Sequence, residues 1–72
     1  MKKAFSFLES LTPTFLEVFG HPTIKFYDDF VEVYFDSSNT FRSLDYFDLS
    51  GYDEFRFFAN DGVITFVWTF YK

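Results

Sequence analysis

The chain has 72 residues, of which 28% are aromatic, with 11 acidic residues, 6 basic residues, one histidine and no cysteine. This length predicts a single compact domain over residues 1–72, and the lack of cysteine excludes disulfides and thiolate zinc sites. The net charge of −5 argues against direct binding to nucleic acid, because phosphate contacts need clustered lysine and arginine.

No apolar run approaches the ~20 residues of a membrane span. The run that begins at Ala4 stops before Glu9, and it is shorter than the core of a signal peptide, which needs about 7–15 apolar residues. We therefore expect a cytoplasmic protein with no membrane partner, located in the host cytoplasm if a phage encodes it.

The apolar side chains between residues 4 and 19 have helical spacing and form one stripe: Phe5, Leu8, Leu11, Phe15 and Phe19. Pro13 cannot donate a hydrogen bond inside a helix, so we expect either two short helices or one kinked helix. Thr12 is a candidate N-cap with Pro13 at the first helical position, and Thr14 with Glu17 is the alternative. Gly20 then ends the helical segment.

From Thr23 onward the apolar period changes to two, which predicts strands at residues 24–27 and 30–35. We take Asp28-Asp29 as a two-residue turn between them. The predicted cross-strand pairs are Phe26 with Val31 and Ile24 with Val33 on one side, and Lys25 with Glu32 and Tyr27 with Phe30 on the other.

Residues 36–40 have the composition of a turn, and residues 41–49 are ambiguous. As a strand they place Arg42, Leu44 and Tyr46 on one face. As a helix they form a short stripe, with Thr40 as the cap: Phe41, Leu44 and Phe47. We favour the strand.

The last hairpin has the strongest local signal, because Asp61-Gly62 is typical of a type I′ turn. Pairing outward from this turn predicts an apolar face that contains Ala59 with Ile64, Phe57 with Phe66, and Phe55 with Trp68. A slip of one residue would place Phe57 opposite Thr65, so the turn and the apolar pattern select the same register.

These elements predict an α+β domain, in which a short or kinked N-terminal helical segment packs on one face of an antiparallel sheet of four to five strands. The core face of the sheet would carry Ile24, Phe26, Val31, Val33, Phe35, Phe55, Phe57, Ile64, Phe66, Trp68 and Phe70. The helical segment would cover it with Phe5, Leu8, Phe15, Leu16 and Phe19. Strand alternation leaves a surplus for the other face: Tyr27, Phe30, Tyr34, Phe58, Val67 and Tyr71.

No motif of a known family or of a catalytic site is identified. Asp28-Asp29 and Asp53-Glu54 are adjacent carboxylates, but neighbours on a strand point to opposite faces. His21 lies in the connection from helix to strand, and nothing resembles a nucleophile elbow or a phosphate loop. We therefore expect a non-enzymatic protein with no cofactor and no metal site.

An exposed aromatic surface beside acidic residues is typical of a protein interface. The residues that we expect to bind a partner are Tyr27, Asp28, Asp29, Phe30, Glu32, Tyr34, Asp36, Glu54 and Phe58. Acidity by itself is also explained by solubility, so the aromatic surplus carries this hypothesis.

We expect an inhibitor that occludes a basic surface of a larger protein, such as a nucleic-acid-binding nuclease or a toxin. Phage-encoded anti-defence proteins, including anti-CRISPR proteins, are of this type. The alternatives are a self-associating structural module that forms a homodimer, an immunity or antitoxin-type protein and, least favoured, a small enzyme that uses His21 and the acidic cluster.

Overall fold

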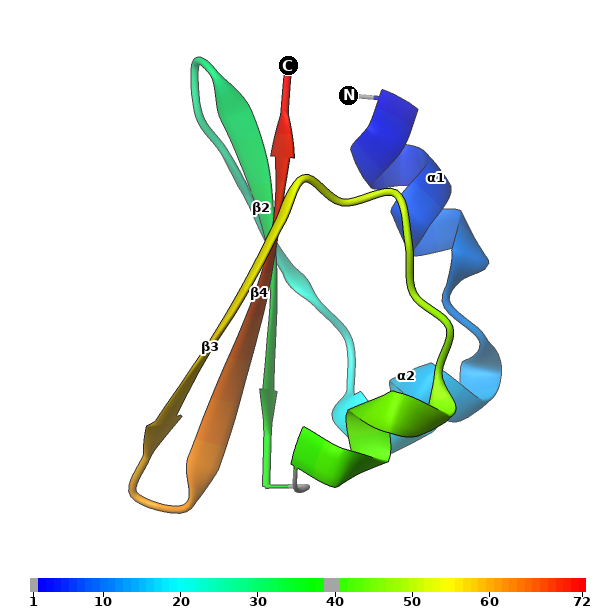
Figure 1. Cartoon of the computed structure of the whole chain (residues 1–72), viewed down its shortest axis with the longest axis vertical. Coiled ribbons are helices and arrows are strands. Elements are labelled where there is room, and N and C mark those ends of the chain that lie inside the picture. Colours follow the sequence, from blue (N-terminus) through cyan, green and yellow to red (C-terminus); the bar gives the residue numbers. More distant parts are fainter. Residues whose placement is uncertain (1, 39–40) are drawn as a thin grey trace.

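The computed structural model describes residues 2–38 and 41–72, in which the helices lie on one side of an antiparallel sheet (Figure 1). The elements are α1 (Lys2–Ser10), α2 (Pro13–Phe19), β1 (Thr23–Phe26), β2 (Phe30–Ser37), the 3-10 helix η1 (Phe41–Tyr46), β3 (Glu54–Asn60) and β4 (Val63–Tyr71). The strand order is β1-β2-β4-β3, so β2 and β4 are central and join the two hairpins. The predicted α+β fold with an antiparallel sheet is confirmed.

Both predicted hairpin registers are confirmed. In the first hairpin, Lys25 lies opposite Glu32, and the Tyr27 N–H donates to the Phe30 carbonyl at 2.9 Å. In the second, the turn residues Asp61 and Gly62 have φ angles of 51° and 80°, as a type I′ turn requires. The pairs that follow this turn are Ala59 with Ile64, Phe57 with Phe66 and Phe55 with Trp68.

The N-terminal segment forms two helices that are separated at Pro13. The Thr12 hydroxyl accepts a hydrogen bond from the Phe15 N–H at 3.1 Å, which makes Thr12 the N-cap of α2. Gly20 ends α2 with a φ of 83°, and its N–H donates to the Leu16 carbonyl at 2.7 Å. The structure therefore selects Thr12 over the alternative cap at Thr14.

The core lies between the two helices and the central strands, and Trp68 is at its centre. The Trp68 ring lies 5.4 Å from Phe7, 5.6 Å from Phe35 and 5.0 Å from Phe55, measured between ring centroids. The Phe15 ring meets Phe35 edge-on at 5.1 Å. Such tilted and edge-on contacts are favourable for aromatic pairs, so a small core is filled by a few bulky side chains.

The predicted stripe was wrong at Phe5, although Leu8 and Leu11 contact the core as expected. Phe5 is 53% exposed, whereas Phe7, which lies off the stripe, is 2% exposed and packs on Phe70. A single stripe from Phe5 to Phe19 requires one continuous helix. Because the helix ends before Pro13, α1 has its own orientation, and its buried face is shifted to include Ala4 and Phe7.

Three side chains that were assigned to the core face of the sheet are exposed at its edges. Phe26 is 60% exposed, and Ile24 and Phe57 are also exposed, although they alternate with the residues of the opposite face as predicted. They belong to the edge strands β1 and β3. The helices have only nine and seven residues, and the buried cluster that they cover draws its strand residues from β2 and β4.

The strand that we favoured for residues 41–49 was also wrong. Residues 41–46 form η1, and Leu44 and Phe47 pack against the core, as the helical alternative predicted. The proposed cap Thr40 lies outside the described residues. The turn predicted for residues 36–40 begins later than expected, because Asp36 and Ser37 still belong to β2, and residues 39–40 lie outside the described part.

Candidate functional site

The sheet surface opposite the helices carries the most distinctive arrangement of polar and aromatic side chains, and we call it the open face. It consists of Lys25, Tyr27, Phe30, Glu32, Tyr34, Asp36, Glu54, Arg56, Phe58, Thr65, Val67, Thr69 and Tyr71, which alternate along the strands with the core residues. Figure 1 shows the sheet nearly edge-on, with α1, α2 and η1 on its other side.

Glu32 is the buried polar centre of the open face. It is 6% exposed, its carboxylate accepts a hydrogen bond from the Tyr34 hydroxyl, and the Arg56 Nη2 lies 2.8 Å from its second oxygen. A carboxylate is costly to bury unless it is paired and hydrogen-bonded. The hydrogen bond from the Tyr34 hydroxyl to Glu32, together with burial, raises the pKa of Tyr34 above its ordinary value.

Two cations of the chain lie against aromatic rings on this face. The Lys25 Nζ is 5.0 Å from the centroid of the Tyr34 ring, and the Arg56 Cζ is 5.9 Å from that of Phe58. These distances suit cation–π attraction. The predicted position of Lys25 opposite Glu32 is confirmed, but the basic side chain that holds the Glu32 carboxylate comes from Arg56 on β3.

The end of the open face near the first turn is an aromatic corner, made of Tyr27, Phe30 and Tyr71. The rings of Tyr27 and Phe30 stack at 4.5 Å, and Phe30 meets Tyr71 edge-on at 6.3 Å. Asp28 and Asp29 are exposed in the turn beside this corner. The backbone N–H of Lys72 donates to the Asp29 carbonyl, and the Lys72 Nζ donates to the Tyr27 carbonyl. Two hydrogen bonds therefore join the residue after β4 to the first turn.

Thr69 lies between two carboxylate residues, since it is the cross-strand partner of Glu32 on one side and of Glu54 on the other. It is 3% exposed, and its hydroxyl oxygen has no hydrogen-bond partner among the described residues. Beside it, hydrogen bonding to Glu54 raises the pKa of Tyr71. The pairing of β2 with β4 is what brings Glu32 and Thr69 together.

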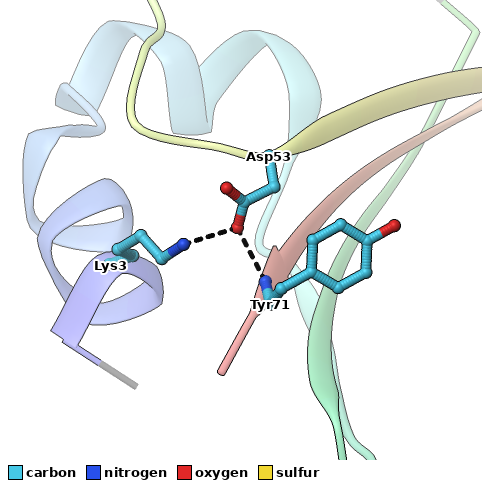
Figure 2. Close-up of polar contacts among 3 residues, drawn as sticks. All are labelled: Lys3, Asp53 and Tyr71. Atoms are coloured by element: carbon cyan, nitrogen blue, oxygen red, sulfur yellow. Dashed lines mark hydrogen bonds and ion pairs between the residues drawn. The ribbon is translucent and has the colours of Figure 1, made fainter.

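Asp53 forms a separate polar cluster that joins α1 to the sheet (Figure 2). Its Oδ2 atom accepts a hydrogen bond from the Lys3 Nζ at 2.7 Å and another from the Tyr71 N–H at 2.7 Å. The Lys3 ammonium, followed by this backbone N–H, lowers the pKa of Asp53. The adjacent acids Asp53 and Glu54 therefore have different surroundings, as their neighbouring positions predicted.

The structure brings most of the predicted partner-binding residues to one face but not to one spot. Tyr27, Asp28, Asp29 and Phe30 gather at the aromatic corner, whereas Phe58 lies toward the tip of the second hairpin. Asp36 lies at the same end as Phe58, since both are cross-strand partners of Thr65, and it accepts a hydrogen bond from the Thr65 hydroxyl at 2.7 Å.

Three residues of the open face lie beside its acidic or aromatic residues but were left out of the predicted site: Arg56, Thr69 and Tyr71. Tyr71 was assigned to this face but not to the site. Alternation along the strands of the second hairpin puts Arg56 and Thr69 on the face opposite the core, and this signal could have found them. Their proximity to Glu32 depends on the contact between the two hairpins.

The remaining candidate features are the single histidine, possible metal sites and possible membrane helices. His21 is exposed in the connection between α2 and β1. In residues 2–38 and 41–72, no three histidine or acidic side chains are grouped so that they could hold a metal ion. No helix in the same residues is long and apolar enough to cross a membrane.

The chain was compared with protein-family models, curated proteins and solved structures. No protein-family model matches the chain, and no curated protein or solved structure matches it.

Proposed function

We propose that this chain is a small, non-enzymatic binding protein that uses its open face to occlude a basic surface on a larger protein. The observation that carries the proposal is the aromatic corner, where Tyr27 and Tyr71 are each about two-fifths exposed beside the carboxylates of Asp28 and Asp29. Exposed aromatic groups are typical anchors of protein interfaces.

The charges of the chain support a basic partner. The net charge of −5 speeds association with a positively charged protein and disfavours association with an acidic one. Glu32 is already paired with Arg56, so Asp28, Asp29 and Glu54 are the acidic groups that we assign to the partner. A nuclease that binds nucleic acid, or a basic toxin, offers a suitable surface, and our proposal is that the chain meets this partner in the cytoplasm.

The proposal is tested by measuring binding of the full chain to a panel of purified nucleases and basic toxins over a range of salt concentrations. We expect at least one partner whose affinity falls with added salt, and a further fall of ten-fold or more for Tyr71→Ala. Tyr46→Ala is the matched control, because Tyr46 is 88% exposed but lies on η1 on the other side of the sheet. Equal losses for the two variants would refute docking by the open face, and affinity that is insensitive to salt would refute the role of charge.

A second candidate, self-association, is favoured by the edge strand β1. Among residues 2–38 and 41–72, no strand pairs with the outer edge of β1, and Ile24 and Phe26 expose apolar side chains there. Such an edge favours pairing with a strand of another chain. Sedimentation velocity at micromolar concentration tests this candidate: a dimer that Phe26→Lys converts to a monomer supports it, and a wild-type monomer refutes an obligate dimer. Such a dimer is compatible with inhibition of a partner.

A further inference from the structure

The open face already binds positively charged side chains of its own. Arg56 is paired with the Glu32 carboxylate and lies over the Phe58 ring, and Lys25 lies over the Tyr34 ring. At both places a cation contacts an aromatic ring, and at Arg56 a carboxylate is added. This face therefore shows, within one chain, the type of contact that a basic partner would make.

A carboxylate and an aromatic ring also occur together beside Thr69. Glu54 supplies an exposed carboxylate, and Tyr71 supplies a half-exposed ring two residues from Thr69 on the same side of β4. The Thr69 hydroxyl is buried between Glu54 and Glu32 and has no partner among the described residues. A buried polar group without a partner is unfavourable, so a donor that reached it would be stabilised.

We propose that Glu54, Thr69 and Tyr71 form a binding site for an arginine side chain of the partner, an inference that rests on the proposed docking by the open face. The guanidinium would donate two hydrogen bonds to Glu54 and one to the Thr69 hydroxyl, and its plane would stack on the Tyr71 ring.

Arginine fits this site better than lysine. Its guanidinium has five N–H donors in a planar fork, which matches a carboxylate with two bonds and leaves donors for a third acceptor. Its flat, weakly hydrated surface also stacks on aromatic rings. A lysine ammonium is a compact, strongly hydrated point charge that cannot bridge the carboxylate and the hydroxyl in the same plane.

The test is an NMR titration of the full chain at low salt with three small probes that are acetylated only on the backbone nitrogen. They are Nα-acetyl-arginine amide, Nα-acetyl-lysine amide with its free side-chain ammonium, and Nα-acetyl-citrulline amide, which is the neutral isostere of the arginine probe. We expect saturable shifts of the Thr69 methyl and Tyr71 ring signals with arginine, several-fold weaker binding of lysine and no binding of citrulline. Glu54→Gln should weaken arginine binding five-fold or more, and Thr69→Val several-fold. Glu17→Gln, at an exposed acid on α2, should have no effect.

Several results would overturn the site: equal binding of citrulline and arginine, wild-type affinity in Glu54→Gln or in Thr69→Val, or shifts spread evenly over the exposed acids. Titration with a ten-residue arginine-rich peptide separates this failure from failure of the proposed function. Shifts at the aromatic corner that Glu54→Gln and Thr69→Val leave unchanged would refute the arginine site and retain docking by the open face. Shifts confined to the helix side would refute both.

Discussion

The Tyr34 hydroxyl donates a hydrogen bond to the Glu32 carboxylate, which belongs to the same strand two residues earlier. Residues two apart on a strand share a face, so both side chains lie on the open face, where Arg56 reaches Glu32 from β3. A buried acid is thus held by one residue of its own strand and one from a strand two positions away in the sheet.

Removing this hydroxyl should destabilise the fold. Tyr34→Phe is expected to lower the free energy of unfolding by about 1–2 kcal/mol, because buried Glu32 loses a donor. Urea unfolding followed by tryptophan fluorescence measures the change. Tyr46→Phe removes an exposed hydroxyl and should change stability by less than about 0.5 kcal/mol; a similar loss in both variants would contradict this role for Tyr34.

The same pair predicts how stability changes at alkaline pH. The pKa of Tyr34 is raised in the folded chain, so its contribution is complete below about pH 10, where an unfolded tyrosine begins to ionise. As pH rises further, the unfolded chain releases a proton that folded Tyr34 keeps, and stability falls. We expect a shallower decline in Tyr34→Phe; an unchanged slope above pH 10 would disprove the coupling.

Phe5 and Phe7 of α1 make a matched pair for mutation. Phe5 was predicted to be in the core but is exposed, whereas Phe7 was not predicted there and is buried. Phe7→Ala should cost about 3–5 kcal/mol, since it removes a buried ring that contacts Trp68 and Phe70. Phe5→Ala, at an exposed position of the same helix, should cost less than about 0.5 kcal/mol. Thermal unfolding of both variants measures the difference, and a reversed order would mean that α1 buries its other face.

Gly62 should resist substitution for a conformational reason. Its φ of 80° lies in the left-handed region, where a side chain costs about 1–2 kcal/mol, although a Cβ atom would meet nothing within 4 Å. Gly62→Ala should therefore lower stability by that amount in chemical unfolding. Asp61→Asn is the control, because asparagine tolerates positive φ in a type I′ turn; if it were equally damaging, backbone strain would not be the cause.

Asp53 should make the attachment of α1 sensitive to acid. The pKa of Asp53 is lowered in the folded chain by Lys3 and by the Tyr71 N–H, so its contribution is present above about pH 3.9 and is lost as pH falls through the lower folded value. Asp53→Asn should lower the melting temperature at pH 7 and have a smaller effect near pH 2.

Two companion variants bear on this prediction. Lys3→Met removes the other half of the ion pair and should show the same pH dependence with a smaller loss. Asp45→Asn, at an exposed acid on η1, should leave the melting temperature unchanged at both pH values. A pH-independent loss in Asp53→Asn would show that the ion pair and hydrogen bond of this carboxylate are not the source of the effect.

Local features of the sequence determined the two hairpins and the junction between the helices. Asp61-Gly62 specifies a turn, and alternation then assigns each side chain of the hairpin to a face, because a slip of one residue would reverse the whole pattern. Thr12 and Pro13 likewise start a helix through contacts within three residues. These signals act over a few positions, so the sequence is sufficient to read them.

The tertiary structure alone decided how these pieces combine. In the folded chain β2 pairs with β4, and Phe7 rather than Phe5 of α1 lies in the core. Leu44 and Phe47, which do not belong to a strand, pack against the core. The tertiary structure also placed Arg56 on Glu32 and left Thr69 buried between two acids. Each outcome depends on contacts between residues far apart in the chain, where several packings satisfy the same local pattern. The aromatic content thus came from the sequence, but the division of those rings between core, edge and open face came from packing.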